Sequence, residues 1–142
     1  MDNLKCFKIK EKFLFLEKVL LYFQETPLIF VCKDSQGVRY LVFCQDTDDF
    51  TYLVCEVELN NLIKYLKSEL SFTSVFELQD FFYKVEARDK EDFSEDKITQ
   101  IEGNKIKSEI NYTEDVYFDS HTSDLKKYVK NLEGEELLWR IP

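Results

Sequence analysis

The chain of 142 residues is 44% hydrophobic and 15% aromatic, which is too apolar for a disordered protein and suits one folded domain over residues 1–142. Its formal charge of −9, from 28 acidic and 19 basic residues, argues against direct binding to nucleic-acid phosphates or anionic lipid and permits a basic protein partner. The start of the chain is unlike a signal peptide, and the apolar run at 13–23 is too short to cross a bilayer. We therefore expect no membrane association and a cytoplasmic location.

The first element that the sequence predicts is a strand over residues 13–23. Its apolar residues also repeat at helical spacing, so a helix is the alternative. The density of aromatic residues and the turn-like Glu25-Thr26-Pro27 that follows favour a strand that pairs with residues 28–33.

Residues 28–57 are predicted to form three further antiparallel strands, LIFVCK, VRYLVFC and TYLVCEV, joined by DSQG and QDTDDF. With Lys33 placed opposite Val38, one face is almost free of charge and is predicted to be core, and it carries Leu28, Phe30, Leu41, Phe43, Leu53 and Cys55. The opposite face carries Ile29, Val31, Tyr40, Val42, Tyr52, Val54 and Glu56. A face this apolar has to be covered by a helix, another layer of strands or a partner, and helix packing is the commonest arrangement.

Leucines at helical spacing predict an amphipathic helix over residues 59–69. Ser74 and Glu77 resemble a capping box that opens a second, short helix. Residues 81–87 have the pattern of a strand, and 86–96 that of an acidic surface loop.

Gly103-Asn104 predicts a second hairpin near 97–112. Ser123 and Gly134 mark the start and the stop of a C-terminal helix at about 124–133. The tail after this helix holds Trp139, which is expected to dock on the domain or to anchor a partner.

Together these elements predict an α+β fold. An antiparallel β-meander at about 13–57 is packed by the amphipathic helix at about 59–69 and by the C-terminal helix at about 124–133. A second hairpin near 97–112 completes the expected architecture.

The residue types that usually carry chemistry are scattered along this sequence. In the predicted register no two of the four cysteines, Cys6, Cys32, Cys44 and Cys55, are direct cross-strand partners, so reduced thiols that pack in the core are expected. The only histidine, His121, lies in a polar segment before the terminal helix, and no zinc or cofactor motif accompanies it. We therefore predict no cofactor, no metal and no enzymatic activity.

The acids Asp46, Asp48 and Asp49 resemble part of a calcium-binding loop. The twelve-residue calcium loop also needs a central glycine and a terminal glutamate, and neither stands in its place here. A charged hairpin turn is the favoured interpretation.

The order of these features resembles a family of small bacterial domains of unknown function, over roughly residues 13–80. The resemblance rests on Glu25-Thr26-Pro27, Leu28, Phe30, Asp34, Gly37, Tyr40, Leu41, Asp46, Asp48, Asp49, Tyr52, Leu53, Leu59, Leu62 and Leu66. The family's turn carries a glycine before the proline, where this chain has Thr26. The resemblance implies a small cytosolic bacterial protein and transfers no functional residue.

The function predicted from the sequence is a non-enzymatic protein-interaction module or an accessory subunit of a bacterial assembly. It would bind through an aromatic sheet face rimmed by acids, with Tyr40, Tyr52 and Trp139 as anchors and Asp46, Asp48 and Asp49 as the acidic rim. The alternative is an acidic immunity or anti-defence protein that blocks the basic cleft of a nuclease or nucleic-acid-binding protein. The oligomeric state is left open.

Overall fold

The structure is a computed structural model that describes residues 4–88, 92–110, 117–119 and 122–139. Over these residues the chain forms one seven-stranded sheet in which every neighbouring pair is antiparallel and the strand order follows the chain. The strands are β1 (Lys5–Ile9), β2 (Lys12–Phe23), β3 (Thr26–Lys33), β4 (Arg39–Asp46), β5 (Thr51–Val57), β6 (Phe81–Glu86) and β7 (Lys97–Glu102). The α+β class and the meander are confirmed, and the meander is longer than expected.

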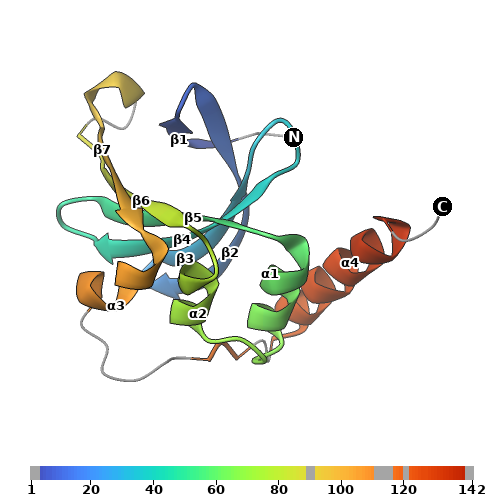
Figure 1. Cartoon of the computed structure of the whole chain (residues 1–142). Helices are drawn as coiled ribbons and strands as arrows, with labels where there is room; N and C mark the ends of the chain where they lie inside the picture. The colour runs from blue at the N-terminus through green and yellow to red at the C-terminus, as the bar shows by residue number, and fades with distance from the viewer. Residues whose placement is uncertain (1–3, 89–91, 111–116, 120–121, 140–142) are drawn as a thin grey trace.

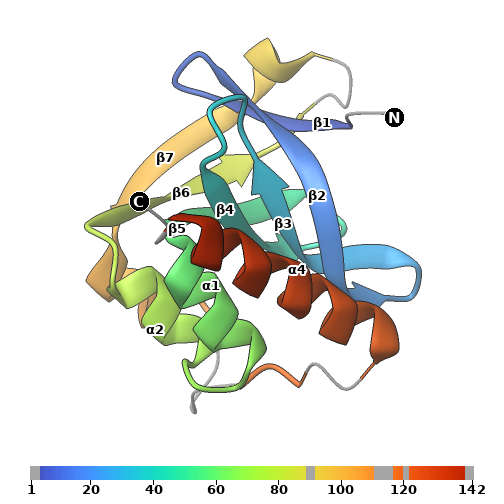
Figure 2. The same cartoon turned by 90° about the vertical axis from the view of Figure 1, so that its right-hand side faces the viewer.

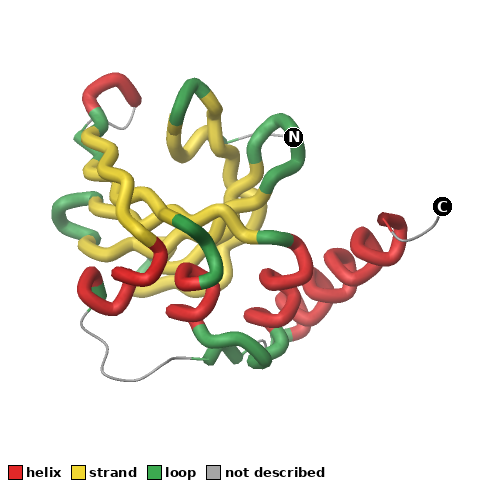
Figure 3. The backbone as a smooth tube through the Cα atoms, in the orientation of Figure 1, coloured by secondary structure: helices red, strands yellow, loops and turns green. Residues whose placement is uncertain are grey.

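The helices gather on one side of this sheet, as Figures 1 and 3 show. They are α1 (Leu59–Leu66), α2 (Phe72–Glu77), α3 (Ile106–Glu109) and α4 (Ser123–Trp139), with single 3-10 turns at Phe93–Glu95 and Gly103–Lys105. Figure 2 shows α4 lying beside α1 and across the sheet. The two predicted main helices are therefore both present and both pack on the sheet.

The sheet curls away from the helices, so that β1 and the start of β7 rise on the opposite side (Figure 1). One cause is visible in the strand pairing. The register shifts once between β1 and β2 and three times between β2 and β3. Such bulges bend a strand and increase its twist, and they are concentrated where the first hairpin folds over the sheet.

The helix-covered face holds the larger core. Inward residues of β3, β4 and β5 alternate along each strand, as a pleated sheet requires, and they contact the apolar stripes of α1, α2 and α4. Its fully buried members include Val31, Leu41, Leu53, Leu62, Phe76, Phe82 and Ile106. Burial of this much aliphatic and aromatic surface is the main force that holds the helices on the sheet.

The opposite, concave face holds a second core that the curled sheet closes by itself. The β1–β2 hairpin folds back over the middle strands, and the enclosed residues are Phe7, Ile9, Leu14, Phe30, Cys32, Tyr40, Val42, Val54, Tyr83 and Val85. The cover over this face is thus a layer of strands, one of the three covers considered, and the preference for a helix was wrong.

The predicted register of the β3–β4 hairpin was wrong by one residue. Lys33 pairs with Arg39 and not with Val38, because Asp34 closes the turn: its backbone N–H donates to the Val38 carbonyl at 2.9 Å. A shift of one residue moves every side chain of a strand to the other face. Phe30 therefore lies on the concave face, and Val31 lies under the helices.

Two predicted turns are also corrected. The β2–β3 turn is formed by Gln24 and Glu25, both at positive φ, so that Thr26 and Pro27 belong to β3. The second hairpin does not form over residues 103–109, where the backbone is helical. A Cβ on Gly103 would lie 2.0 Å from the Gln79 carbonyl oxygen, so this glycine permits close contact with α2; it does not make a hairpin turn.

The helix ends differ from the predicted ones by a few residues. Ser71, not Ser74, caps α2, and its hydroxyl accepts the Ser74 N–H at 3.3 Å. Thr122 caps α4 by accepting the Leu125 N–H at 3.2 Å. Gly134 lies inside α4 and does not stop it.

A cluster of charged and polar side chains fixes α4 to the sheet. Arg39 of β4 is 6% exposed and donates to the Glu17 carboxylate at 2.7 and 2.9 Å and to the Glu135 carboxylate at 3.0 and 2.8 Å. The Tyr128 hydroxyl donates to Glu17 at 2.9 Å. A guanidinium and a carboxylate form two parallel hydrogen bonds in only one relative orientation. The pairs of Arg39 with Glu17 and Glu135 therefore fix the position of α4 on the sheet.

Candidate functional sites at the two ends of the concave face

Two cavities open at opposite ends of the concave face. The first, here called the apolar cavity, has a volume of about 490 Å³ and lies where the β2–β3 turn, the β4–β5 turn and the segment after β6 meet. The second, the polar cavity, has about 290 Å³ and lies between the β1–β2 turn and the loop that joins α2 to β6. Both exist because the curled sheet closes over its middle strands but not over their ends.

The wall of the apolar cavity is built from aromatic side chains of three neighbouring regions. Phe7 stacks on Phe30 with ring centres 6.3 Å apart, and Tyr52 meets the edge of Phe7 at 5.2 Å. Phe50 and Phe93 line the mouth. Apolar walls with a few polar groups are typical of binding cavities.

Large apolar side chains are also exposed around this mouth. Leu4 and Phe50, which line it, are 59% and 43% exposed. The adjoining tip of β2 exposes Leu21, Tyr22 and Phe23, the last two at 60% and 53%, and these two pair across the hairpin with Pro27 and Thr26 of the cavity wall. Three consecutive exposed apolar residues at a strand end are unusual for a solvated hairpin and mark a contact surface.

The predicted acidic turn borders the same end of the sheet. The Asp46 carboxylate accepts the N–H groups of Asp48 and Asp49 at 2.9 and 3.1 Å, which folds the β4–β5 turn and presents Phe50 at its end. All three acids are exposed. Glu25 and Asp96 line the cavity together with the basic Lys5 and Arg88, so the lining is balanced in charge, and the three acids of the neighbouring turn make its surroundings acidic.

Cys6 distinguishes the apolar cavity chemically. It lines the cavity and is half-buried, whereas Cys32, Cys44 and Cys55 are buried. A hydrogen bond from Cys32 lowers the pKa of the Cys6 thiol against the opposing effect of burial. The same contact, with burial, raises the pKa of Cys32. Cys6 is therefore the thiol of this chain that is best placed to react with a molecule in the cavity.

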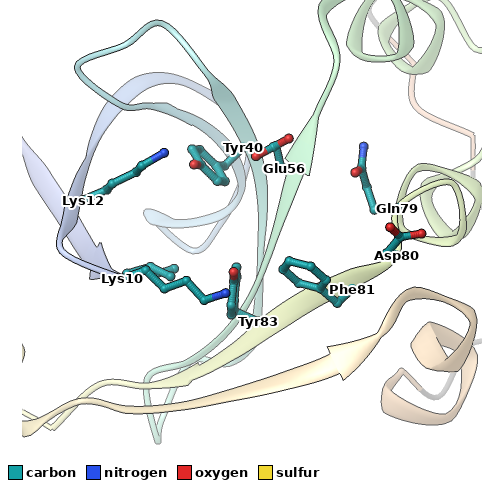
Figure 4. A pocket seen from close by; sticks show the side chains of 9 residues that line it. Lys10, Lys12, Tyr40, Glu56, Gln79, Asp80, Phe81 and Tyr83 are labelled. Carbon is teal, nitrogen blue, oxygen red and sulfur yellow. The ribbon is translucent and has the colours of Figure 1, made fainter.

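The polar cavity combines charges of both signs with aromatic rings, as Figure 4 shows. Lys10 and Lys12 reach in from the β1–β2 turn on one side. Glu56 and Asp80 lie across from them, at the end of β5 and before β6. The rings of Tyr40, Phe81 and Tyr83 form the wall between the two groups of charges.

Tyr40 is held in place at this cavity by the β3–β4 turn. Its hydroxyl donates to the Asp34 carboxylate at 3.3 Å, and the other oxygen of Asp34 accepts the N–H groups of Gln36 and Val38. Burial, followed by the negative charges of Asp34 and Glu56, raises the pKa of Tyr40. The phenol is therefore protonated at neutral pH and has no acid–base role there.

The residues singled out from the sequence do not lie together. Tyr40 lines the polar cavity and Tyr52 the apolar one, where burial, followed by the charges of Cys44 and Cys6, raises the Tyr52 pKa to about 12. Asp46, Asp48 and Asp49 border the apolar end. Trp139 is the last residue of α4, its side chain lies outside the described part of the structure, and Leu137 and Leu138 before it are exposed.

Sequence reasoning missed several residues of both sites. Phe7, Phe50 and Cys6 were not singled out, and neither were the two lysines of the β1–β2 turn. One signal in the sequence could have identified Phe50. It is an apolar residue at the end of an acidic turn, where solubility alone would favour a polar residue. The approach of β1 to β3 and β5 depends on the curl of the sheet, which no local pattern shows.

Within the described ranges, no group of three or more His, Cys, Asp or Glu side chains is arranged to hold a metal ion, and His121 lies outside them. No described helix has the length and apolar character needed to cross a membrane. Comparison with known protein families, with curated proteins and with solved structures found no match. The two cavities, and not a relative, therefore have to carry the functional argument.

Proposed function

We propose that this protein is a non-enzymatic interaction module that binds an apolar and basic segment of a partner protein at the apolar end of the concave face. The observation that carries the proposal is the joining of a 490 Å³ cavity with exposed apolar side chains on both sides of its mouth. A cytoplasmic location and a bacterial assembly remain parts of the proposal.

The exposed side chains favour a protein over a small molecule as the occupant. A small ligand is mostly enclosed by its cavity, and it would leave Tyr22 and Phe23 of the β2 tip uncovered. A protein segment can place one side chain in the cavity and lie over the tip with the rest. Central aromatic anchors surrounded by a polar rim are typical of such interfaces.

The charge of the rim specifies the chemistry of that segment. Asp46, Asp48 and Asp49 stand beside Phe50, and the whole chain carries −9. Complementary charge speeds encounter and selects partners more than it adds affinity. The partner segment is therefore expected to combine aromatic or aliphatic side chains with lysine or arginine.

A display library of random peptides tests this proposal without knowledge of the natural partner. Selection on the folded protein should enrich peptides that combine apolar and basic residues. Phe50→Ser should weaken their binding about tenfold or more, as expected for a central anchor. The matched control is Leu137→Ser, which removes an even more exposed apolar residue from the far end of α4 and should leave binding unchanged.

The role of the acids is tested by replacing Asp46, Asp48 and Asp49 together with asparagine, which keeps the acceptor that folds the turn. Binding should weaken at low salt, and the difference from the unchanged protein should shrink at high salt. Acidic selected peptides, or peptides whose binding is lost only in Leu137→Ser, would overturn the proposal. If high salt abolishes peptide binding to the unchanged protein and Phe50→Ser has little effect, the narrower role of an acidic inhibitor that occupies a basic cleft is favoured.

A further inference from the structure

The polar cavity, at the other end of the concave face, is lined by four exposed charged residues, Lys10, Lys12, Glu56 and Asp80. Among the described residues, Lys10, Glu56 and Asp80 form no ion pair, and Lys12 approaches the nearly buried Asp34 only at 4.0 Å. The ammonium of Lys10 lies 5.1 Å from the centre of the Phe81 ring and 5.5 Å from that of Tyr83. The aromatic wall of the cavity is thus in contact with the lysine side.

The charges are separated across the cavity and are not mixed. Lys10 lies in the β1–β2 turn and Lys12 is the first residue of β2, and both acids lie on the opposite side of the cavity, as Figure 4 shows. A molecule that satisfies both sides must carry a negative group and a positive group at its two ends. An anion alone would leave Glu56 and Asp80 facing it, and a cation alone would face the lysines, so each would meet one repelling side.

The volume limits the size of that molecule. At about 290 Å³ the cavity lies at the lower end of the range for small-ligand sites, which suits a molecule of one amino-acid unit. The rings of Tyr40, Phe81 and Tyr83 offer an apolar surface for its side chain. The Tyr83 hydroxyl, which has no hydrogen-bond partner among the described residues, adds a donor and acceptor.

The backbone of the β1–β2 turn holds the lysine side of the cavity in place. Lys10 and Glu11 both have positive φ, 49° and 67°. Residues other than Gly, Asn and Asp rarely adopt this backbone conformation. A strained turn that persists in a short hairpin is a feature to be explained. Here it directs the Lys10 ammonium over the aromatic wall.

From these features we propose that the polar cavity binds a free zwitterionic amino acid with an apolar side chain. Lys10 and Lys12 hold its carboxylate, and Glu56 and Asp80 hold its ammonium group. This site is separate from the apolar cavity, so an experiment can refute one of the two proposals and leave the other standing.

Calorimetric titration with L-phenylalanine tests the site against two matched analogues. 3-Phenylpropionate lacks the ammonium group, and 2-phenylethylamine lacks the carboxylate. The amino acid should bind about fivefold or more tightly than either analogue, since each analogue loses one exposed ion pair and meets one repelling side. Equal binding of an analogue, or no binding of the amino acid at millimolar concentration, would overturn the proposal.

Substitutions then locate the site. Glu56→Gln should reduce the preference for the amino acid over 3-phenylpropionate, with Asp80 still in place, and Lys10→Ala with Lys12→Ala should remove the preference over 2-phenylethylamine. The charge-matched controls are Glu69→Gln and the double variant Lys64→Ala with Lys127→Ala, all at exposed positions outside the cavity lining, and they should change neither preference. Preferences that survive the cavity substitutions, or binding of peptides but not of free amino acids, would contradict the assignment.

Discussion

The two faces of the sheet are buried by different means. Helices cover one face and leave a continuous core, whereas the sheet's own curl covers the concave face and leaves a cavity at each end. Helices that pack on the outer face of the sheet can shift along it until their side chains fill the space. The β1–β2 hairpin, which folds over the concave face, cannot shift in this way at its ends. We therefore expect most of the stability to come from the helix-covered face, and we propose that binding takes place on the concave face.

The largest predicted effect contrasts two phenylalanines, one on each face. Phe82 is fully buried under the helices and meets Phe76 edge-on at 5.2 Å, so Phe82→Ala should lower the free energy of unfolding by about 4 kcal/mol. Phe30→Ala should cost about 2 kcal/mol, the transfer contribution alone, because the vacated space joins an open cavity that water fills. Urea unfolding measures both, and equal losses would refute the contrast.

The next effect concerns the attachment of α4. Arg39→Ala leaves the Glu17 and Glu135 carboxylates facing each other without their cation, which should cost about 3 kcal/mol. Arg39→Met, which refills the volume, should recover part of the loss. The control is Lys67→Ala, which breaks the exposed Lys67–Glu133 pair between α1 and α4 at 3.0 Å and should cost clearly less. A cost for Arg39→Ala no larger than for the control would show that the cluster does not fix the helix.

Acidification tests the same cluster. The hydrogen bonds from Arg39 hold the pKa of Glu135 below its usual range. A carboxylate with a lowered pKa in the folded state stabilises the protein above its unfolded pKa of about 4.3, and this stability is lost as the pH falls through the folded-state pKa. The unchanged protein should therefore lose stability below about pH 4 more steeply than Arg39→Met. Parallel pH profiles of the two proteins would contradict this.

The smallest effect concerns the two hairpin turns that border the cavities. Glu11 and Glu25 have φ values of 67° and 70°, which glycine adopts without strain. Glu11→Gly and Glu25→Gly should each raise the free energy of unfolding by about 0.5–1 kcal/mol. Thermal unfolding measures the change. Destabilisation by either substitution would show that the glutamate side chain is needed in the fold.

Much of the fold could be predicted from local patterns. The leucine stripe of α1 and the apolar runs of β2 to β5 were found because periodicity reports which side chains are buried. The faces of β4 and β5 were assigned correctly, with Leu41 paired to Cys55 and Cys44 to Tyr52. The faces of β3 were exchanged, because the turn around Asp34 is one residue longer than the pattern suggested and a strand has a period of two.

The sites could be predicted only in part. Tyr40, Tyr52 and the acids of the β4–β5 turn were proposed as partner-binding residues, and that role stays a prediction. The two tyrosines line the two cavities, whereas the acids lie in the turn before Phe50 and are not among the lining residues. That Tyr40 and Tyr52 belong to different cavities depends on where β1 and β2 fold over the sheet. The bulges in β2 set that path, and bulges leave no readable mark in an apolar strand.

The central claim is that a partner segment enters the apolar cavity, and Cys6 reports on it directly. At neutral pH Cys6 should be the thiol that alkylation labels first in the folded protein, because its pKa is lowered by Cys32 while burial raises the pKa of Cys44 and Cys55. The decisive measurement is the rate of Cys6 alkylation with and without a saturating selected peptide. A peptide bound in the apolar cavity should slow this rate strongly, whereas an unchanged rate in the complex would show that the segment does not enter the cavity.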